Sequence, residues 1–366
     1  MRIAIDAREL LGKPTGVGRY LRSILAAWNE LPGAAAHHYV FCTPSGFHDH
    51  TLPNLEKTFR AGGGRGTVFE QTRLPLMIRD ASADVLFAPG YSGPLFGRVP
   101  MVVTIHDVSF AAHPEWFSRR EGLRRRVLTG LSARRAARII TVSDFSKREI
   151  VRHVGVDGAK VEVIYSGATQ LPSEGGRGKG GGGPDSGPLV LFVGSLFNRR
   201  HLPELIEGFT RMAQRHPEAR LEIVGDNRTT PHLDIDGLIA GSPSRSRIRA
   251  RSYVTDPELA DLYASASAFA FLSDYEGFAM TPLEALGAGV PVVLLDTEVA
   301  REIYGPAARY VERPDPALIA DALAHVLFDE AERARLLAVA APTLERYSWR
   351  DCAHRTLQVL LACARS

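Results

Sequence analysis

The segment "AFAFLSDYEGFAMTPLEALGAGVPVVLL" (268–295) places a short helical pattern between two apolar strands. Neither strand alternates apolar with polar residues, which is typical of strands covered on both faces in a parallel sheet. Parallel neighbours need a long crossover connection, and a helix is the usual one. The segment therefore predicts an α/β layer, with Glu276 and Glu284 following the carboxyl end of the first strand.

The same alternation runs through the whole chain of 366 residues, which is long enough for two domains with full cores. Uninterrupted apolar runs predict strands at 2–6, 39–42, 85–88, 101–105, 138–142, 161–164, 189–193, 220–224, 268–272 and 292–295. Helical patterns lie between them, for example at 203–216, 257–266, 316–329 and 347–364. We predict two Rossmann-like, doubly wound α/β domains, residues 1–172 and 188–346, facing each other across a cleft at the carboxyl ends of their strands.

Two glycine-rich stretches interrupt this pattern. "SEGGRGKGGGGPDSG" (173–187) has no apolar residue, so burial cannot offset the entropy of ordering it, and we expect a flexible linker there. "AGGGRG" (61–66) predicts a loop within the first domain.

Composition excludes several classes of protein. With 45% hydrophobic and 23% charged residues, the chain is typical of soluble globular proteins, and no apolar run reaches the ~18 residues of a membrane span. "MRIAIDAREL" fits a strand better than a signal peptide. Three cysteines in no metal-binding spacing favour a reducing cytoplasm, and a net charge of +3 gives no argument for nucleic acid.

The charge is concentrated in "SRREGLRRRVLTGLSARRAARI" (118–139), which has eight arginines and one acid, Glu121. Leu123, Val127, Leu128 and Leu131 recur at helical spacing, which predicts a basic amphipathic helix. The segment can be a solvated helix face. It can also be a surface that docks on anionic lipid or on a phosphorylated acceptor.

Thr281 to Glu284 form a plausible helix start. Thr281 as N-cap, Pro282 at the first position and Glu284 at the third would make a capping box. The same helix N-terminus would also suit a phosphate. Glu276 has no capping role, and a carboxylate there can accept hydrogen bonds from the vicinal hydroxyls of a sugar.

Arginines and glycines follow other strands. Arg199 and Arg200 are either surface residues or cations that neutralise a departing diphosphate. Gly16 and Gly18 lack the third glycine of a dinucleotide fingerprint, because Leu21 stands there, so hydride transfer is not expected. These glycines are better suited to a loop that closes over a diphosphate and an acceptor.

Four further polar residues stand at strand ends in the first half. His106 and Asp107 follow the strand 101–105, and Asp107 can orient His106 or contact an acceptor. Asp144 and Lys147 can be a helix N-cap and a solvated lysine, or contacts to an acceptor or phosphate. In the second half, Asp234-Ile-Asp236 could suggest a metal site, but it lies in a polar loop and we interpret it as structural.

The spacing of Glu276 and Glu284 within "EGFAMTPLEALGAGVPVV" resembles the signature of retaining glycosyltransferases of family 4, which have the GT-B fold. Other blocks of the family pattern occur in order along nearly the whole chain. They are "IDARELLGKPTGVGRYLRSIL", "TIHDVSF", "RIITVSDFSKREI", "KVEVIYSGA", "LFVGSLFNRRHLPELIEGF", "RSYVTDPELADLYASASAF" and "YSWRDCAHRTL". The last block resembles a terminal helix, 347–366, that packs back on the first domain.

The resemblance implies roles for individual residues. Glu284 would bind the ribose of a nucleotide-sugar, Glu276 a hydroxyl of the transferred sugar, and His106 the donor sugar, with Arg199 and Arg200 at the diphosphate. Further donor contacts would come from Gly16, Gly18, Ser195, Val254, Gly277, Phe278, Ala279, Met280 and Thr281. Acceptor contacts would come from Asp107, Asp144 and Lys147. The sequence departs from the family at Ser195, where an arginine is usual, and at Arg200, where a lysine is usual.

The resemblance also implies the reaction. It indicates metal-independent transfer without a cofactor, from a nucleotide-sugar to a saccharide or lipid-linked acceptor, with retention of configuration. The style of the motifs is most similar to bacterial polysaccharide and lipopolysaccharide mannosyl- or rhamnosyltransferases, which suggests GDP-mannose. Two alternatives remain, a sugar-nucleotide epimerase of the same fold and a non-catalytic sugar-nucleotide-binding protein.

Overall fold

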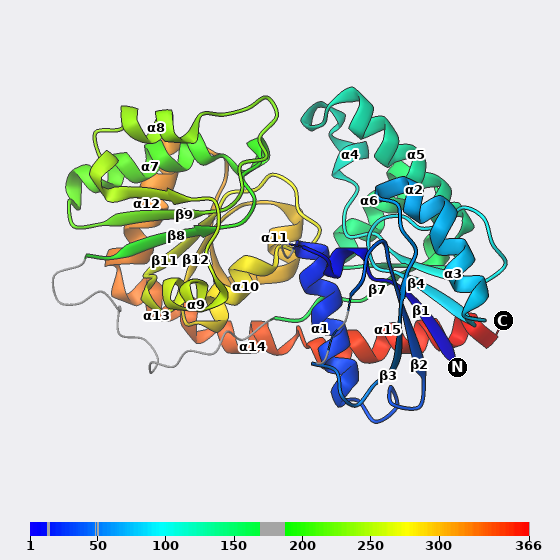
Figure 1. Cartoon of the computed structure of the whole chain (residues 1–366). Coiled ribbons are helices and arrows are strands. Elements are labelled where there is room, and N and C mark those ends of the chain that lie inside the picture. The colour runs from blue at the N-terminus through cyan, green and yellow to red at the C-terminus, as the bar shows by residue number, and fades with distance from the viewer. Residues whose placement is uncertain (13–14, 48, 50, 169–186, 366) are drawn as a thin grey trace. The chain divides into compact units, whose positions relative to one another are not determined.

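The protein is described by a computed structural model over residues 1–12, 15–47, 49, 51–168 and 187–365. The chain divides into two compact units (Figure 1). Unit 1 combines Met1–Gly167 with Tyr347–Ser366, and unit 2 is Ala168–Arg346. The predicted linker 173–187 lies outside the described residues, except for Gly187.

Unit 1 is built on a seven-stranded parallel sheet with the order β3-β2-β1-β4-β5-β6-β7. Its strands are β1 (Arg2–Asp6), β2 (His38–Thr43), β3 (Glu56–Ala61), β4 (Val85–Ala88), β5 (Met101–Thr104), β6 (Arg138–Thr141) and β7 (Val161–Val163). Its helices are α1 (Gly16–Glu30), α2 (Gly66–Val68), α3 (Leu74–Asp80), α4 (Ser109–Ala112), α5 (Arg119–Arg135), α6 (Asp144–Val154) and α15 (Trp349–Arg365).

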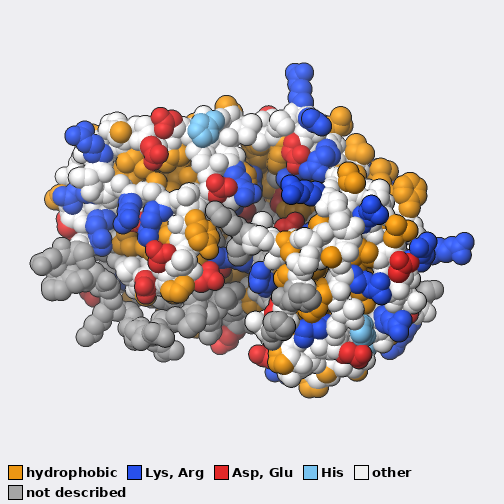
Figure 2. Space-filling model, in the orientation of Figure 1, with side chains coloured by type: hydrophobic (Ala, Val, Ile, Leu, Met, Phe, Trp, Pro, Cys, Tyr) orange, Lys and Arg blue, Asp and Glu red, His pale blue; other side chains and the backbone are white. Residues whose placement is uncertain are grey.

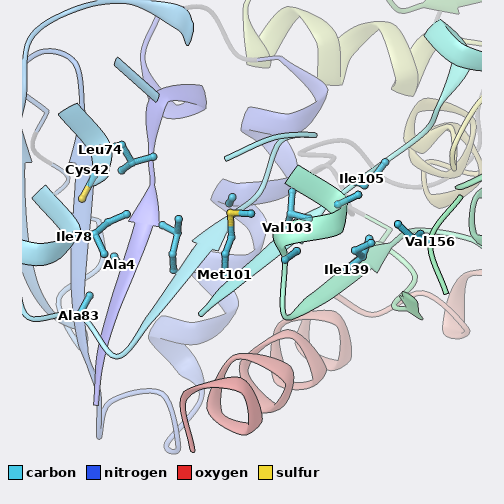
Figure 3. Packing of buried hydrophobic residues seen from close by; sticks show 14 of the residues in the cluster. Ala4, Cys42, Leu74, Ile78, Ala83, Met101, Val103, Ile105, Ile139 and Val156 are labelled. Atoms are coloured by element: carbon cyan, nitrogen blue, oxygen red, sulfur yellow. The ribbon is translucent and has the colours of Figure 1, made fainter. Parts of the chain in front are cut away.

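Apolar side chains cover both faces of this sheet, which is why its inner strands read as unbroken apolar runs. On one face, Ala4 and Val103 pack in one cluster with Leu74 and Ile78 of α3 (Figure 3). The C-terminal helix α15 packs on β4, β5 and β6 and against α1. The buried indole Nε1 of Trp28 in α1 donates to the backbone oxygen of Ala353 over 2.8 Å.

Unit 2 is built on a six-stranded parallel sheet with the order β10-β9-β8-β11-β12-β13. Its strands are β8 (Leu189–Val193), β9 (Arg220–Val224), β10 (Ile248–Arg251), β11 (Ala268–Phe271), β12 (Val292–Leu295) and β13 (Ala308–Val311). Its helices are α7 (Leu202–Arg215), α8 (Ile235–Gly241), α9 (Asp256–Ser265), α10 (Met280–Gly287), α11 (Glu298–Tyr304), α12 (Pro316–Phe328), α13 (Glu330–Ala338) and α14 (Ala340–Glu345).

The two sheets share a topological feature that places binding sites. The strand order reverses between β1 and β4 in unit 1 and between β8 and β11 in unit 2. In open α/β sheets, ligands bind beyond the carboxyl ends of the strands at this switch point. Across the described ranges, no helix combines the length and the apolar character needed to cross a bilayer.

Candidate active site

In unit 2, the residues that follow β8 and β11 lie together because these two strands are neighbours. The Oε1 atom of Glu276 accepts hydrogen bonds from Nε and Nη2 of Arg200, at 2.9 and 2.8 Å, and from Oγ of Ser273, at 2.8 Å. Its Oε2 atom forms no hydrogen bond within the described part of the chain. The carboxylate is thus held by one oxygen and offers the other.

Arg200 is fixed from several sides. It is 9% exposed, its Nη1 donates to the backbone oxygen of Ser195 over 2.7 Å, and its guanidinium lies 4.6 Å from the ring centre of Phe271. A Cβ atom on Gly194 would come within 2.6 Å of Nη1, so only glycine leaves room for this arginine. Arg200 therefore orients Glu276, a role that its sequence position did not indicate.

Arg199 and His201 tie the two loops together. Arg199 donates from Nε to the backbone oxygen of Tyr275 over 3.1 Å, and its own carbonyl accepts from the amide of Asp274 over 3.0 Å. His201 bonds the Asp274 carboxylate through Nε2 at 2.7 Å and lies 3.6 Å from Glu204 through Nδ1. Burial lowers the pKa of His201, but these two acids outweigh it and raise the pKa to about 9. The sequence analysis missed this histidine.

The helix that carries Glu284 begins two residues earlier than predicted. The N-cap of α10 is Ala279, in the left-handed region at φ 61°, and no side chain caps the helix. Thr281 and Glu284 are the second and fifth helical residues, so the predicted capping box is wrong. Glu284 is instead 4% exposed, and its Oε2 accepts from the hydroxyl of Tyr263 over 2.9 Å.

Three other predicted donor contacts lie at this helix start. Gly277 and Phe278 are buried in the loop before it, and Met280 opens its first turn, half-buried. Val254 is buried directly before Thr255, the N-cap of α9. A capping box does form there, between Thr255 and Glu258. Its Thr-x-x-Glu spacing could have been found in the sequence.

In unit 1, His106 follows β5 with one ring nitrogen already engaged. Its Nε2 lies 2.8 Å from the backbone oxygen of Pro89, and because a carbonyl only accepts, Nε2 carries the proton. Burial lowers the pKa of His106, so the ring is neutral and its Nδ1 is an acceptor. Tyr20 contacts the ring edge-on at 4.8 Å. The orienting partner of His106 is therefore Pro89.

Asp107 has its own partners, since it accepts from the hydroxyl of Tyr91 over 2.8 Å and from the hydroxyl of Ser109 over 2.6 Å. The N-cap of α6 is Ser143 and not Asp144, which is the first helical residue and accepts from the Tyr165 hydroxyl over 3.1 Å. Lys147 lies half-buried in the same helix.

The two glycines of α1 differ. A Cβ atom on Gly18 would come within 2.5 Å of the backbone oxygen of Glu9, and its amide is bound by the N-cap Thr15. Close packing thus accounts for a glycine at position 18, and its expected role at a diphosphate stays a prediction. A Cβ atom on Gly16, the first residue of the helix, would meet only open space.

A buried ion cluster at the same edge of unit 1 was not predicted. Nη2 of Arg8 contacts the carboxylates of Asp6 at 2.6 Å and Glu70 at 2.5 Å, and Ser92 donates to Glu70 over 2.9 Å. Burial lowers the pKa of Arg8, and the two carboxylates more than compensate. Arg8 and Asp6 both stand in the quoted "IDAREL" block, so only Glu70 and Ser92, distant in sequence, were hidden.

Asp234 of the Asp-Ile-Asp pair has a structural role in unit 2. The Oδ1 atom of Asp234 caps α8 by accepting from the amide of Gly237 over 2.9 Å, which agrees with the structural interpretation of that pair. No group of three or more His, Cys, Asp or Glu side chains that could hold a metal ion occurs among the described residues.

Comparison with known families divides the chain as the units do. A model described as Glycosyltransferase Family 4 matches residues 14–169, and one described as Glycosyl transferases group 1 matches residues 179–340. The chain is 28% identical over 336 residues to a glycogen synthase of Mycobacterium tuberculosis, covering 87% of this chain and 78% of that protein. It is 26% identical over 269 residues to the O-antigen chain mannosyltransferase B of Escherichia coli, covering 70% and 68%.

Solved structures show the same fold. The structure of Anabaena Alr3699/HepE in complex with UDP and glucose superposes with a TM-score of 0.75 at 18% identity, covering 99% of this chain and 100% of that one. Two all-parallel α/β units with switch points in both sheets, together with these matches, define a glycosyltransferase with the GT-B fold. The chain belongs to glycosyltransferase family 4.

Proposed function

We propose that the protein transfers a hexose with retention of configuration from a nucleotide diphosphate sugar to a saccharide or lipid-linked acceptor. The observation that carries the proposal is Glu276, a carboxylate that Arg200 fixes through Oε1 while Oε2 takes no protein hydrogen bond in the described regions. Such an oxygen is suited to accept from a sugar hydroxyl. Glu284, buried beside the same loop, is our candidate for the ribose.

The diphosphate is the group that must be stabilised as it leaves. We assign this task to Arg199 and to the N-terminus of α10, where backbone amides point out of the helix and no side chain caps them. A charged guanidinium and a helix end can supply the positive potential that a metal ion gives in other enzymes. We therefore propose transfer without a metal or cofactor.

His106 is our candidate for the contact to the donor sugar. Because Nε2 donates to Pro89, Nδ1 is left to accept a hydroxyl hydrogen. In the step that we propose, the bond from the anomeric carbon to the diphosphate oxygen breaks on the face where the acceptor oxygen bonds. The acceptor's proton passes to the departing diphosphate, so the charges balance without an enzymic nucleophile.

GDP-mannose is our proposed donor. Relatives named as O-antigen mannosyltransferases in Escherichia coli and Salmonella typhimurium support mannose, and the sequence motifs agree with them. We place the reaction in the cytoplasm, because the three cysteines are buried and form no disulfide, which suits a reducing compartment.

Calorimetric titration with GDP-, UDP-, dTDP- and ADP-sugars tests the proposal. We expect one nucleotide to bind in the micromolar range, Glu284→Ala to weaken it by about tenfold or more, as for a lost charged hydrogen bond, and His106→Ala to lower turnover mainly. Binding of none of the four, or unchanged affinity in Glu284→Ala, would contradict the donor assignment. A new free nucleotide-sugar without transfer would instead indicate an epimerase.

A further inference from the structure

Helix α5 of unit 1 turns its large apolar side chains away from the core. Leu123, Val127 and Leu131 are 57%, 47% and 42% exposed, and their spacing of four residues puts them on one face, about 12 Å long. We call this row the α5 ridge. The buried residues of the helix are all small: Gly122, Thr129, Gly130, Ser132 and Ala133. A surface helix normally buries its large apolar stripe, so α5 is inverted.

Arginines surround the α5 ridge. Arg120 stands three residues before Leu123 and Arg134 three residues after Leu131, so both extend the same face at its ends. Arg124 and Arg125 share one acid, Glu121, at 2.7 Å each, so this group keeps one positive charge. The exposed side chains of Arg119, Arg120, Arg126 and Arg134 form no ion pair within the regions that the structure describes. On the face shown in Figure 2, hydrophobic and basic side chains lie beside one another along the edge where Figure 1 labels α5.

Two neighbouring segments add exposed apolar side chains. Arg124 donates from Nη1 to Thr67 over 3.2 Å, which holds α2 against α5, and the next residue, Val68, is 64% exposed. Arg135, the last residue of α5, donates from Nη2 to the backbone oxygen of Gly97 over 3.0 Å, beside Phe96, which is 75% exposed. Large exposed apolar groups therefore gather around one helix.

We propose that the α5 ridge docks on an anionic lipid bilayer, with the leucines and valine entering the interface and the arginines binding lipid phosphates. A helix that lies in a membrane interface has this combination of an apolar face and flanking basic residues. Arginine forms paired hydrogen bonds with phosphate, and an anionic leaflet attracts basic segments. A soluble phosphorylated acceptor would use the arginines and leave the ridge in water, so the lipid surface explains both features.

The docking surface belongs to unit 1, which carries Asp107, Asp144 and Lys147, the expected acceptor contacts. The chain runs from His106 and Asp107 through α4 directly into α5. Docking through α5 would bring a lipid-linked acceptor and this unit to the same surface. This purpose rests on the proposed function, but the docking itself is measured without donor or acceptor, so the two can fail separately.

Sedimentation of the full chain with vesicles tests the proposal. One set of vesicles contains phosphatidylcholine alone. The other contains phosphatidylcholine with about 30% phosphatidylglycerol, which is anionic. We expect binding to the anionic vesicles only, weakened by salt. Replacing one exposed arginine by glutamine should lower the partitioning of the protein onto anionic vesicles about fivefold. The four single variants are Arg119→Gln, Arg120→Gln, Arg126→Gln and Arg134→Gln. Leu123→Ser, Val127→Ser and Leu131→Ser together should remove the binding that survives at high salt.

The matched control is Phe328→Ser, which removes an equally exposed apolar side chain, 41%, from unit 2 and should leave partitioning unchanged. Both sets of changes are at exposed positions, and the arginine set keeps the proposal testable if the triple serine variant does not fold. The proposal would be overturned if the protein bound neutral and anionic vesicles equally, or bound neither. It would also be overturned if the arginine variants and the serine variant all bound as well as the unchanged protein. A dimer in sedimentation velocity that the serine variant dissociates would overturn it too, since the ridge would then be a contact between copies.

Discussion

At the scale of single residues, the candidate donor site is a set of charged pairs whose members hold one another in place. Arg200 follows a strand, and the family resemblance implied that it contacts the diphosphate. In the structure it is bound to Glu276 and buried on Phe271. A buried arginine of this kind is strongly destabilising to remove, because its partner's charge is left unpaired. It acts through the carboxylate that it holds.

His201 gives this site a predictable dependence on pH. Its pKa is raised from 6.5 to about 9, so its ion pairs are present at neutral pH. A raised pKa contributes stability that is complete below pH 6.5 and is lost as the pH rises through about 9. We therefore expect the two loops to loosen, and nucleotide affinity to fall, above about pH 9.

Asp274→Asn tests this expectation, since it removes one of the two acids that raise the pKa. The histidine should then lose its proton nearer to neutral pH, and the fall in affinity should move down with it. The measurement is calorimetry with the bound nucleotide from pH 6 to 10, together with the NMR titration of the His201 ring. His216→Gln, at a half-buried histidine of the same unit, is the control. If Asp274→Asn does not change the pH dependence of nucleotide affinity, the ion pairs of His201 do not hold the two loops together.

Two buried tyrosines of unit 1 provide a matched pair for stability. The hydroxyl of Tyr39 donates to the backbone oxygen of Ala34 over 3.0 Å. The hydroxyl of Tyr20 has the hydroxyls of Thr104 and Thr356 near it, but none of the three reaches full hydrogen-bond geometry with a described protein group. Both tyrosine side chains are at most 1% exposed. Tyr39→Phe should therefore lower the free energy of unfolding by about 1 kcal/mol or more, and Tyr20→Phe should change it little or raise it. Urea unfolding of both variants measures the two changes in the free energy of unfolding. Equal decreases would show that the Tyr20 hydroxyl has a stabilising hydrogen-bond partner.

At the scale of elements, the sequence predicts inner strands well and edge strands poorly. The three strands that the analysis missed, β3, β10 and β13, all lie at sheet edges. Their residues are partly exposed, as in "EKTFRA" of β3, so they lack the unbroken apolar run that marks a strand covered on both faces. The inverted helix α5 was likewise predicted as a helix, but the direction of its apolar face depends on packing that the spacing does not reveal.

Helix starts show the same limit, and they allow a direct test. Thr255 and Thr281 both precede a Glu at the third following position, but only Thr255 caps a helix, because the backbone at Ala279 starts α10 earlier. Thr255→Ala should cost about 1 kcal/mol of stability. Thr281→Ala, inside its helix, should cost clearly less. Chemical denaturation of the two variants compares them, and the reverse order would mean that the threonine of α10 has a capping role.

At the scale of the whole molecule, the prediction of two parallel α/β layers is confirmed, and so is the GT-B fold. The repeated strand-helix pattern determines such a layer locally, and the order of the family motifs extends it to the chain. The contacts between residues around the site were harder to predict from the sequence. Tyr263, Pro89 and Glu70 come from distant segments, and no spacing rule connects them with Glu284, His106 or Arg8.

The division of the chain makes one further prediction, because unit 1 is completed by the last helix of the sequence. Seven residues of α15 are buried, among them Leu357, Val359 and Leu360. Burying each such side chain contributes about 2 kcal/mol, so their loss rivals the roughly 5–15 kcal/mol that stabilises a domain.

Removing residues 347–366 should therefore unfold unit 1 and leave the nucleotide site of unit 2 intact. Calorimetric scanning should lose one of two transitions, while the nucleotide that binds the full chain still binds with similar affinity. Arg350→Ala, at an exposed position of the same helix, should change neither measurement. Two retained transitions would show that unit 1 folds without α15. Loss of nucleotide binding would place part of the donor site outside unit 2, and Glu276, Arg199 and Glu284 would then be insufficient to hold the donor.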